Sequence, residues 1–151
     1  MGNKSQAKKI PKFAPENRPK RAEEPRIGVS VEGSANPVWR LAHMDWDGPW
    51  CPSKCAEAGV RQILIRLAGF ESMSWTQIQS GSGSHLVGAA GIIKEARQRL
   101  NELRKEEWSD HLFSLRMSNK ARLWGFLRAG VFHALWWDPE HQVFPSQKKH
   151  T

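Results

Sequence analysis

The residues best suited to do chemistry are concentrated near the end of this 151-residue chain. Arg116, Lys120 and Arg122 lie in or beside segments with the alternation of β-strands, and an acid-proline-acid-histidine cluster, residues 138–141, follows a later segment of the same kind. RNA cleavage without a metal needs a base for the 2′-hydroxyl proton, a cation beside the phosphate and an acid for the leaving oxygen. His, Asp, Glu, Arg and Lys supply these groups, so the segment contains every type of side chain that this chemistry needs.

Strands joined by tight turns would position these groups. Alternation predicts strands over residues 113–117, 121–128 and 131–137, with turns at Ser118-Asn119 and Ala129-Gly130. Strands linked in this way are antiparallel neighbours, so the end of the last strand returns to the start of the middle one. The topology therefore predicts one corner that contains Arg116, Lys120, Arg122, Asp138, Glu140 and His141, with Arg128 at the opposite end.

The same residues also have structural interpretations. Asp138 and Glu140 can pair with the strand arginines as a surface ion-pair cluster of little energetic value, and Asp-Pro is a common way to end a strand. His85 lies in a Gly/Ser-rich segment and His111 precedes the first strand, and the sequence assigns neither a role. His133 is expected to be a packed histidine if its face is the core, and by alternation that face also contains Val131, Leu135 and Trp137.

Two main helices are predicted before these strands. The first starts near Pro52 and ends at Gly69, a capping box at Ser74 opens a short helical turn, and the second long helix covers residues 90–105. Residues 79–85 are predicted to be a flexible loop. We therefore expect an α+β domain, with helices packed on one face of a small antiparallel sheet that ends in a C-terminal three-stranded meander. The expected apolar face of the first helix is Val60, Ile63, Leu64, Leu67 and Ala68.

Positive charge is concentrated at the start of the chain. The net charge is +8, and residues 1–26 hold eight Lys or Arg against three Glu. This composition predicts a disordered basic tail, followed by one domain at 27–146, which opens with a short strand or a continuation of the tail, and a disordered end at 147–151. The tail either solubilises the chain or binds a polyanion such as nucleic acid. In the second case the binding residues are Lys8, Lys9, Lys12, Lys20 and Arg21.

Several classes of protein are excluded by composition. No apolar run is long enough to span a membrane, and no secretory signal is evident, so we expect a cytoplasmic protein with no membrane partner. Cys51 and Cys55 are too few for a zinc site; they are either a redox pair on one helical face or two small residues at a helix start. No metal and no cofactor is therefore expected.

The predicted elements and the motifs of the last strands resemble those of a known family. Two helices followed by Leu-Phe-x-Leu-Arg, Arg-Leu-Trp-Gly-Phe and Val-Phe-His-x-Leu-Trp-Trp-Asp-Pro-Glu-His resemble the RelE/ParE toxin superfamily, including its YoeB- and HigB-like members. The chain also resembles uncharacterised bacterial and phage proteins with the Trp-Trp-Asp-Pro-Glu-His ending. The resemblance covers roughly residues 55–146 and is strongest over 112–144. The chain contains no tyrosine, so any role of a family tyrosine is vacant here.

The resemblance implies a toxin that cleaves mRNA on the ribosome and is held in check by an antitoxin, expected to be acidic. Family sites use strand arginines and lysines with a C-terminal His or Tyr, whereas ParE-like members inhibit gyrase, so the fold alone does not fix the activity. One alternative is a non-catalytic nucleic-acid- or ribosome-binding accessory protein with a basic N-terminal arm; another is a docking protein for an acidic peptide. The catalytic residues implied are Arg116, Lys120, Arg122 and His141, with Glu140 as a second acid or base.

Overall fold

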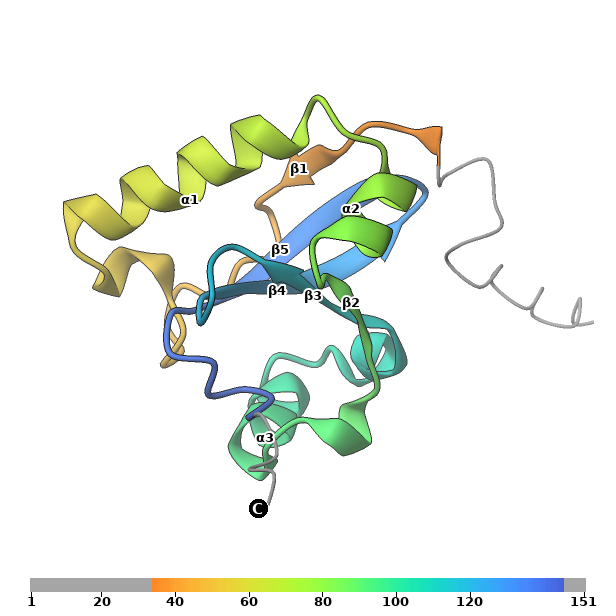
Figure 1. Ribbon diagram of the computed structural model, residues 1–151. Helices are drawn as coiled ribbons and strands as arrows, with labels where there is room; N and C mark the ends of the chain where they lie inside the picture. The colour runs from red at the N-terminus through yellow and green to blue at the C-terminus, as the bar shows by residue number, and fades with distance from the viewer. Residues whose placement is uncertain (1–33, 146–151) are drawn as a thin grey trace, which may run out of the picture.

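Helices cover both faces of one five-stranded sheet in the computed structural model, which describes residues 34–145 apart from the side chains of Ser109 and His111 (Figure 1). The basic tail, the strand or tail segment at 27–31 and the chain end after residue 146 lie outside this range. The elements in chain order are β1 (Val38–Arg40), the 3-10 helix η3 (Pro52–Lys54), α1 (Glu57–Phe70), α2 (Trp75–Gly81), β2 (His85–Val87), η4 (Ala89–Gly91), α3 (Lys94–Glu102), η5 (Glu106–His111), β3 (Leu112–Arg116), β4 (Arg122–Arg128) and β5 (Val131–Asp138).

The strands are ordered β1-β5-β4-β3-β2 across the sheet. β3, β4 and β5 form the predicted antiparallel meander, so the α+β class and the C-terminal meander are confirmed. The sheet is mixed rather than wholly antiparallel, because β1 runs parallel to β5 with Trp39 opposite Phe132. A parallel neighbour requires a long crossover, and here the crossover includes α1, α2 and α3. β2 completes the far edge, antiparallel to β3.

The β4–β5 turn has the geometry that a tight hairpin requires. Ala129 and Gly130 have φ angles of 51° and 74°, which places both in the left-handed region used by type I′ turns. The Nε1 of Trp75 in α2 donates to the carbonyl of Gly130 at 2.8 Å, so the turn is fixed to a helix. At the other turn, the Ala121 amide donates to the Ser118 hydroxyl oxygen at 3.0 Å. Both predicted turns are confirmed.

Each face of the sheet has its own core. The α1-face core lies under α1 and α2, and the α3-face core lies against α3 and η5 (Figure 1). Successive strand residues, such as Leu123 and Trp124, point to opposite faces of the sheet, and both are apolar and buried. Each face must therefore be covered by other elements of the chain. The expectation that helices pack on one face only is therefore wrong. The largest fully buried side chains are Phe70, Trp75, Ile78, Leu100, Leu112, Phe113, Leu115, Leu123, Trp124, Phe132, Leu135 and Trp136.

Three predicted segments have different bounds in the structure. The first helix begins at Glu57 rather than near Pro52, because Pro52–Lys54 forms a separate 3-10 helix. The helix expected over 90–105 is confined to α3, because Ala89–Gly91 forms a separate 3-10 turn and Leu103 ends the helix. The segment expected to be a loop, 79–85, instead contains the end of α2 and the first residue of β2. The short β2 places His85 in the sheet, which matters for the site described below.

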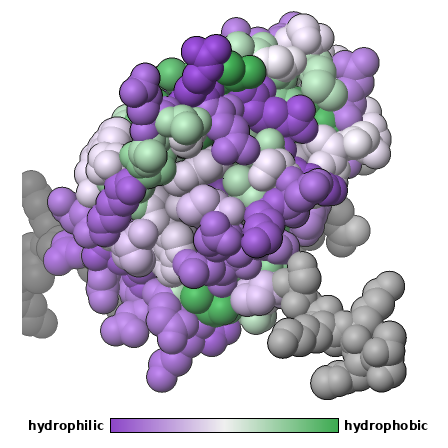
Figure 2. All heavy atoms as spheres, turned by 60° about the vertical axis from the view of Figure 1, so that its left-hand side comes forward, coloured by the Kyte–Doolittle hydropathy of each residue, from purple (hydrophilic) through white to green (hydrophobic). Residues whose placement is uncertain are grey.

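α1 buries a narrower stripe than its sequence suggests. Ile63, Leu67 and Phe70 are buried against the sheet, whereas Val60 and Leu64 are exposed. Figure 2 shows hydrophobic residues in small groups among hydrophilic neighbours, at the top and at the lower edge of this view. The predicted apolar face was therefore only partly right: of its five residues, Ile63 and Leu67 pack against the sheet, and Val60, Leu64 and Ala68 face solvent.

A β-bulge interrupts the pairing of β4 with β5. Trp124 pairs with Trp136 but Gly125 pairs with Ala134, so Leu135 has no partner on β4. Leu135 and Trp136 both enter the α3-face core, whereas Trp137 enters the α1-face core. The predicted alternation that put Trp137 on the face of His133 is wrong because the bulge shifts the phase by one residue. A Cβ at Gly125 would lie 2.2 Å from the His133 carbonyl oxygen, so only glycine fits.

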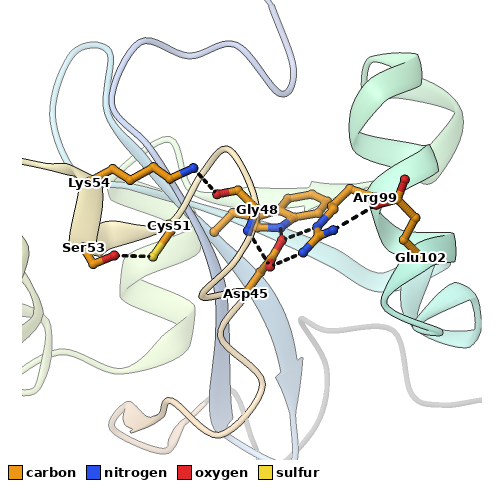
Figure 3. Close-up of polar contacts among 8 residues, drawn as sticks. Asp45, Gly48, Cys51, Ser53, Lys54, Arg99 and Glu102 are labelled. Carbon is orange, nitrogen blue, oxygen red and sulfur yellow. Dashed lines mark hydrogen bonds and ion pairs between the residues drawn. The ribbon is translucent and has the colours of Figure 1, made fainter.

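A partly buried ion pair, between buried Asp45 and Arg99, joins α3 to the loop after β1 (Figure 3). Asp45 accepts from Arg99 Nη2 at 2.7 Å and from Arg99 Nε at 2.8 Å, and from the Trp136 indole at 3.1 Å. Its Oδ1 also accepts from the Gly48 amide. Burial by itself would raise the pKa of Asp45, but the hydrogen bonds from Arg99 and Trp136 outweigh it, and the pKa is lowered. These contacts hold α3 at a fixed position over its face.

The cysteines lie near the start of α1. Both thiols are free: the Cys51 sulfur lies 2.8 Å from the Ser53 hydroxyl, and the Cys55 thiol donates to the Pro52 carbonyl at 2.7 Å.

No helix within residues 34–145 is long and apolar enough to cross a membrane.

Candidate functional site

The predicted corner forms on the α3 face, where the β3–β4 turn meets the end of β5. Arg116 lies opposite Arg122, and Arg122 lies opposite Asp138. Alternation then places all three residues on the same face of the sheet. The fold-back expected from the meander is therefore present, and Arg128 lies at the far end of β4, as predicted.

Two guanidinium groups converge on one backbone carbonyl. Arg116 Nε donates to the Ser118 oxygen at 3.3 Å, and Arg122 Nη1 donates to the same oxygen at 2.9 Å. Each side chain has one further acceptor: Asn119 Oδ1 for Arg116 and the Ala121 carbonyl for Arg122. Because Arg116 Nε and Arg122 Nη1 contact the same Ser118 oxygen, they can be no farther apart than the sum of these two distances. The two positive charges are therefore neighbours.

Arg122 is a buried cation with little compensation. It is 8% exposed, and among residues 34–145 no carboxylate lies within ion-pair distance of it. Burial and the charge of Arg116 lower the pKa of Arg122, and Asp138 offsets this only in part. Placing like charges together and removing them from water both cost free energy. An anion bound between Arg116 and Arg122 would recover that free energy.

Asp138 anchors a loop and forms no ion pair with any residue between 34 and 145. It is 0% exposed, and its Oδ1 accepts from the Gln142 amide at 2.8 Å. Its Oδ2 accepts from the Val143 amide at 2.9 Å and from the Trp124 indole at 3.3 Å. The expectation that Asp138 simply pairs with the strand arginines is corrected, because its acceptor positions are used by the chain just ahead of it. Asp138 thus fixes residues 139–143.

His141 sits on this anchored loop in the left-handed conformation, with φ of 59°. Non-glycine residues rarely adopt this conformation, although His is among those enriched there. The imidazole is half-buried, and its pKa is lowered first by burial and then by Arg122, with smaller effects of the same sign from His85 and Arg116; Asp138 acts in the opposite direction. His141 is therefore close enough to both arginines to interact with them electrostatically. Because its pKa lies below the usual 6.5, the imidazole is mostly neutral at pH 7.

His85 is a member of the site that sequence reasoning missed. It lies on β2 opposite Ser114, so it is on the face of Arg116. The backbone amide of Arg116 donates to the neighbouring Ser84 hydroxyl at 2.9 Å, which fixes β2 against the site. Gly83, with φ of 74°, leaves room for the Arg116 side chain: a Cβ there would be 3.1 Å from Arg116 Nη1. The sequence signal was the run His-Leu-Val after the glycines, which is short but compatible with a strand.

Lys120 and Glu140 lie at the rim. Their side chains are 74% and 62% exposed and form an ion pair at 3.6 Å. Of the predicted residues, Arg116, Arg122 and His141 are therefore brought together, and Lys120 and Glu140 pair with each other at the edge. Lys8, Lys9, Lys12, Lys20 and Arg21 lie outside the described residues.

No protein-family model, curated protein or solved structure matches this chain. The chemistry that the corner can perform depends on its own side chains. The arginine pair can hold an anionic group such as phosphate, and two imidazoles can accept and donate protons. In the part of the chain that the structure describes, no group of three or more His, Cys, Asp or Glu side chains is arranged to hold a metal ion.

Proposed function

We propose that this protein is an endoribonuclease that cleaves RNA through the 2′-hydroxyl group. The observation that carries the proposal is the pair of guanidinium groups on the Ser118 carbonyl, with Arg122 buried and without an ion-pair partner among residues 34–145. A scissile phosphate between Arg116 and Arg122 would neutralise the pair. The same arginines would stabilise the extra negative charge that develops as the 2′-oxygen attacks phosphorus.

In this mechanism the two histidines move the protons. His141 is neutral at ordinary pH and accepts the proton of the 2′-hydroxyl, and the 2′-oxygen then forms a bond to phosphorus. The bond from phosphorus to the 5′-oxygen breaks, and His85 donates a proton to that oxygen. The products are a 2′,3′-cyclic phosphate and a 5′-hydroxyl end. In the proposed mechanism Glu140, which is paired with Lys120 at the rim, transfers no proton.

The resemblance noted from the sequence suggests the biological setting. We propose, on that ground alone, that the RNA is mRNA, that cleavage is stimulated by the ribosome, and that an acidic antitoxin protein inhibits the chain. The order of helices followed by a strand meander is compatible with this proposal. A non-catalytic role in RNA or ribosome binding is the alternative that the experiment must separate.

The test compares RNA with a matched substrate that cannot react. Purified full-length chain is incubated with a labelled RNA, with and without ribosomes, and with the same RNA carrying a single 2′-deoxy substitution at each mapped cleavage position. Cleavage is expected only where the 2′-hydroxyl is present, and it should leave a cyclic phosphate. Equal cleavage of the deoxy-substituted RNA would refute the mechanism, and binding without any cleavage would favour the non-catalytic alternative.

Variants of the two histidines and the arginines then test the roles. His141→Asn and His85→Asn should each slow cleavage by about 10²–10⁴-fold, and Arg122→Gln by about 10²–10³-fold. Lys94→Gln provides the matched control, because Lys94 is an exposed cation on α3. Folding of each variant is checked by circular dichroism. If His141→Asn cleaves as fast as the wild type while folded, His141 is not the base.

A further inference from the structure

A second basic cluster lies at the opposite end of the α3 face from the arginine pair. We call it the His43–His133 cluster; it comprises Arg40, His43, Lys105, Trp108, Arg128 and His133. These residues come from β1, the loop after it, the segment between α3 and η5, η5 itself, and the far ends of β4 and β5. Arg122 and Arg128 are six residues apart on β4, which corresponds to roughly 20 Å. One phosphate group cannot contact both sites.

The rings of the cluster are packed together. The His43 ring lies 4.7 Å from the Trp108 ring and 5.5 Å from the His133 ring, measured between centroids. The Trp108 and His133 centroids are 5.8 Å apart. Trp108 also packs edge-on to Phe126, at 4.3 Å, which attaches the cluster to the α3-face core. The two imidazoles are therefore held in fixed positions before any ligand arrives.

Cations surround these rings. Lys105 Nζ lies 3.3 Å from His43 Nδ1, and it lies 5.6 Å from the Trp108 ring. The Arg128 guanidinium carbon is 5.3 Å from the same ring. Glu107, an exposed residue, accepts from the Trp108 indole at 2.9 Å. The charged groups that act on the two imidazoles are Arg40 and Lys105 at His43, and His43, Arg40 and Arg128 at His133, and all of them are basic.

One buried polar atom of the cluster has no partner. His133 is 9% exposed, and its Nδ1 makes no hydrogen bond to any residue that the structure describes. Buried polar atoms are nearly always hydrogen-bonded, so such an atom calls for an explanation. Burial and the surrounding cations lower the pKa of His133 and of His43. An anionic ligand would reverse the effect of the cations and would supply an oxygen acceptor.

We propose that the His43–His133 cluster is a second anion site, which binds a phosphate group distant from the one that is cleaved. The anion would lie among Lys105, Arg40 and Arg128, with the imidazoles of His43 and His133 as hydrogen-bond donors. That the phosphate belongs to the RNA strand rests on the proposed function. The binding of phosphate itself rests only on the geometry of the cluster.

The test follows the imidazole rings directly. The full-length His141→Asn chain, which should cleave RNA much more slowly than the wild type, is titrated with inorganic phosphate and, separately, with short RNA carrying or lacking a 5′-phosphate. The ring signals of His43 and His133 are recorded by NMR and assigned with single His→Asn variants. We expect inorganic phosphate and both RNAs, which carry phosphate in their backbone, to shift these two signals and to raise the pKa of both imidazoles.

A pair of lysine variants shows whether the effect is local. Lys105→Gln should weaken phosphate binding at these histidines at least about tenfold, since a charge-assisted contact contributes roughly 1.5 kcal/mol or more, whereas Lys94→Gln should leave it unchanged. Lys105→Arg should retain it. Absence of any shift at His43 and His133 with phosphate or RNA would overturn the proposal, and so would equal losses from Lys105→Gln and Lys94→Gln.

The two proposals fail separately. If RNA is not cleaved by the wild-type chain but phosphate shifts His43 and His133, the second site stands and the proposed nuclease function fails. If RNA is cleaved but these two histidines do not respond to phosphate or RNA, the nuclease stands and the second site fails. If inorganic phosphate shifts the signals and RNA does not, the anion site stands and its assignment to the RNA strand is refuted.

Discussion

Replacement of Asp138 by Asn tests the central structural inference, that this carboxylate anchors the His141 loop. The variant keeps the size of the side chain but replaces one acceptor oxygen by an NH2 group. The wild-type carboxylate accepts from two backbone amides, at 2.8 Å and 2.9 Å, and from the Trp124 indole, at 3.3 Å. In Asp138→Asn one of the two oxygens is lost, so at least one N–H donor would face another donor.

The expected cost follows from those contacts. A hydrogen bond to a charged acceptor contributes roughly 1.5–3 kcal/mol, and Asp138 is 0% exposed, so water cannot replace the lost acceptor. Loss of the negative charge also leaves buried Arg122 with less compensation, which acts in the same direction. We therefore expect Asp138→Asn to lower the free energy of unfolding by about 2–3 kcal/mol.

Glu140→Gln is the matched control, since it removes a charge from the same loop. Its ion pair with Lys120 is long and exposed, and such pairs contribute about 0–1 kcal/mol. Urea unfolding of both variants measures the difference, and RNA cleavage at low urea measures the effect on the site. Asp138→Asn should also slow cleavage, because the loop no longer holds His141. Equal stability of the two variants would refute the anchoring role.

Four further predictions concern other parts of the fold. His141→Ala should lower the free energy of unfolding by about 1 kcal/mol more than His141→Asn, since Asn tolerates a positive φ angle; urea unfolding compares them. Asp45→Asn should destabilise by about 1.5–3 kcal/mol, because a buried charged acceptor of several hydrogen bonds is lost while Arg99 keeps its ion pair with Glu102, and the same measurement checks it. Acid should weaken the fold through His43 and His133. Their pKa values are lower in the folded chain than the usual 6.5, so the unfolded chain takes up protons first as the pH falls. The stability that is present above pH 6.5 should therefore be lost as the pH drops through the pKa values of the folded chain. A wild-type pH series of unfolding free energies, set beside a His43→Gln, His133→Gln double variant with a flatter profile between pH 5 and pH 7, tests this sign. Ala129→Asn should stabilise by about 0.5–1 kcal/mol, as Asn-Gly suits a type I′ turn, and thermal unfolding detects it.

The meander and its corner were predictable because they depend on local signals. Turn residues at 118–119 and 129–130 and the alternation between them specify two hairpins. Antiparallel pairing then brings Arg116, Arg122 and His141 together without any knowledge of the rest of the fold. The structure adds the distances, and it shows that both guanidinium groups share the Ser118 carbonyl.

The rest depended on contacts between distant segments, which sequence patterns do not reveal. β2 is a strand only because it pairs with β3, about 27 residues later, so His85 had no local signal strong enough to place it. β1 pairs with β5 across most of the domain, and in parallel. The role of Asp138 was missed for another reason: its partners are backbone amides just ahead of it, which a search for opposite charges does not consider.

The extra residue in β5 has a consequence for how the site can vary. If Leu135 were deleted, Trp136 would follow Ala134 directly, and the strand would alternate regularly with Trp136 and Asp138 still toward α3 and Trp137 still toward α1. A deletion of Trp137 that left the bulge in place would instead turn Asp138 toward α1, and the Asp-Pro-Glu-His loop would emerge on the side away from the arginines. Substitutions along β5 leave the geometry in place. The bulge is therefore a position in β5 where the loss of one residue would leave the corner on the same face.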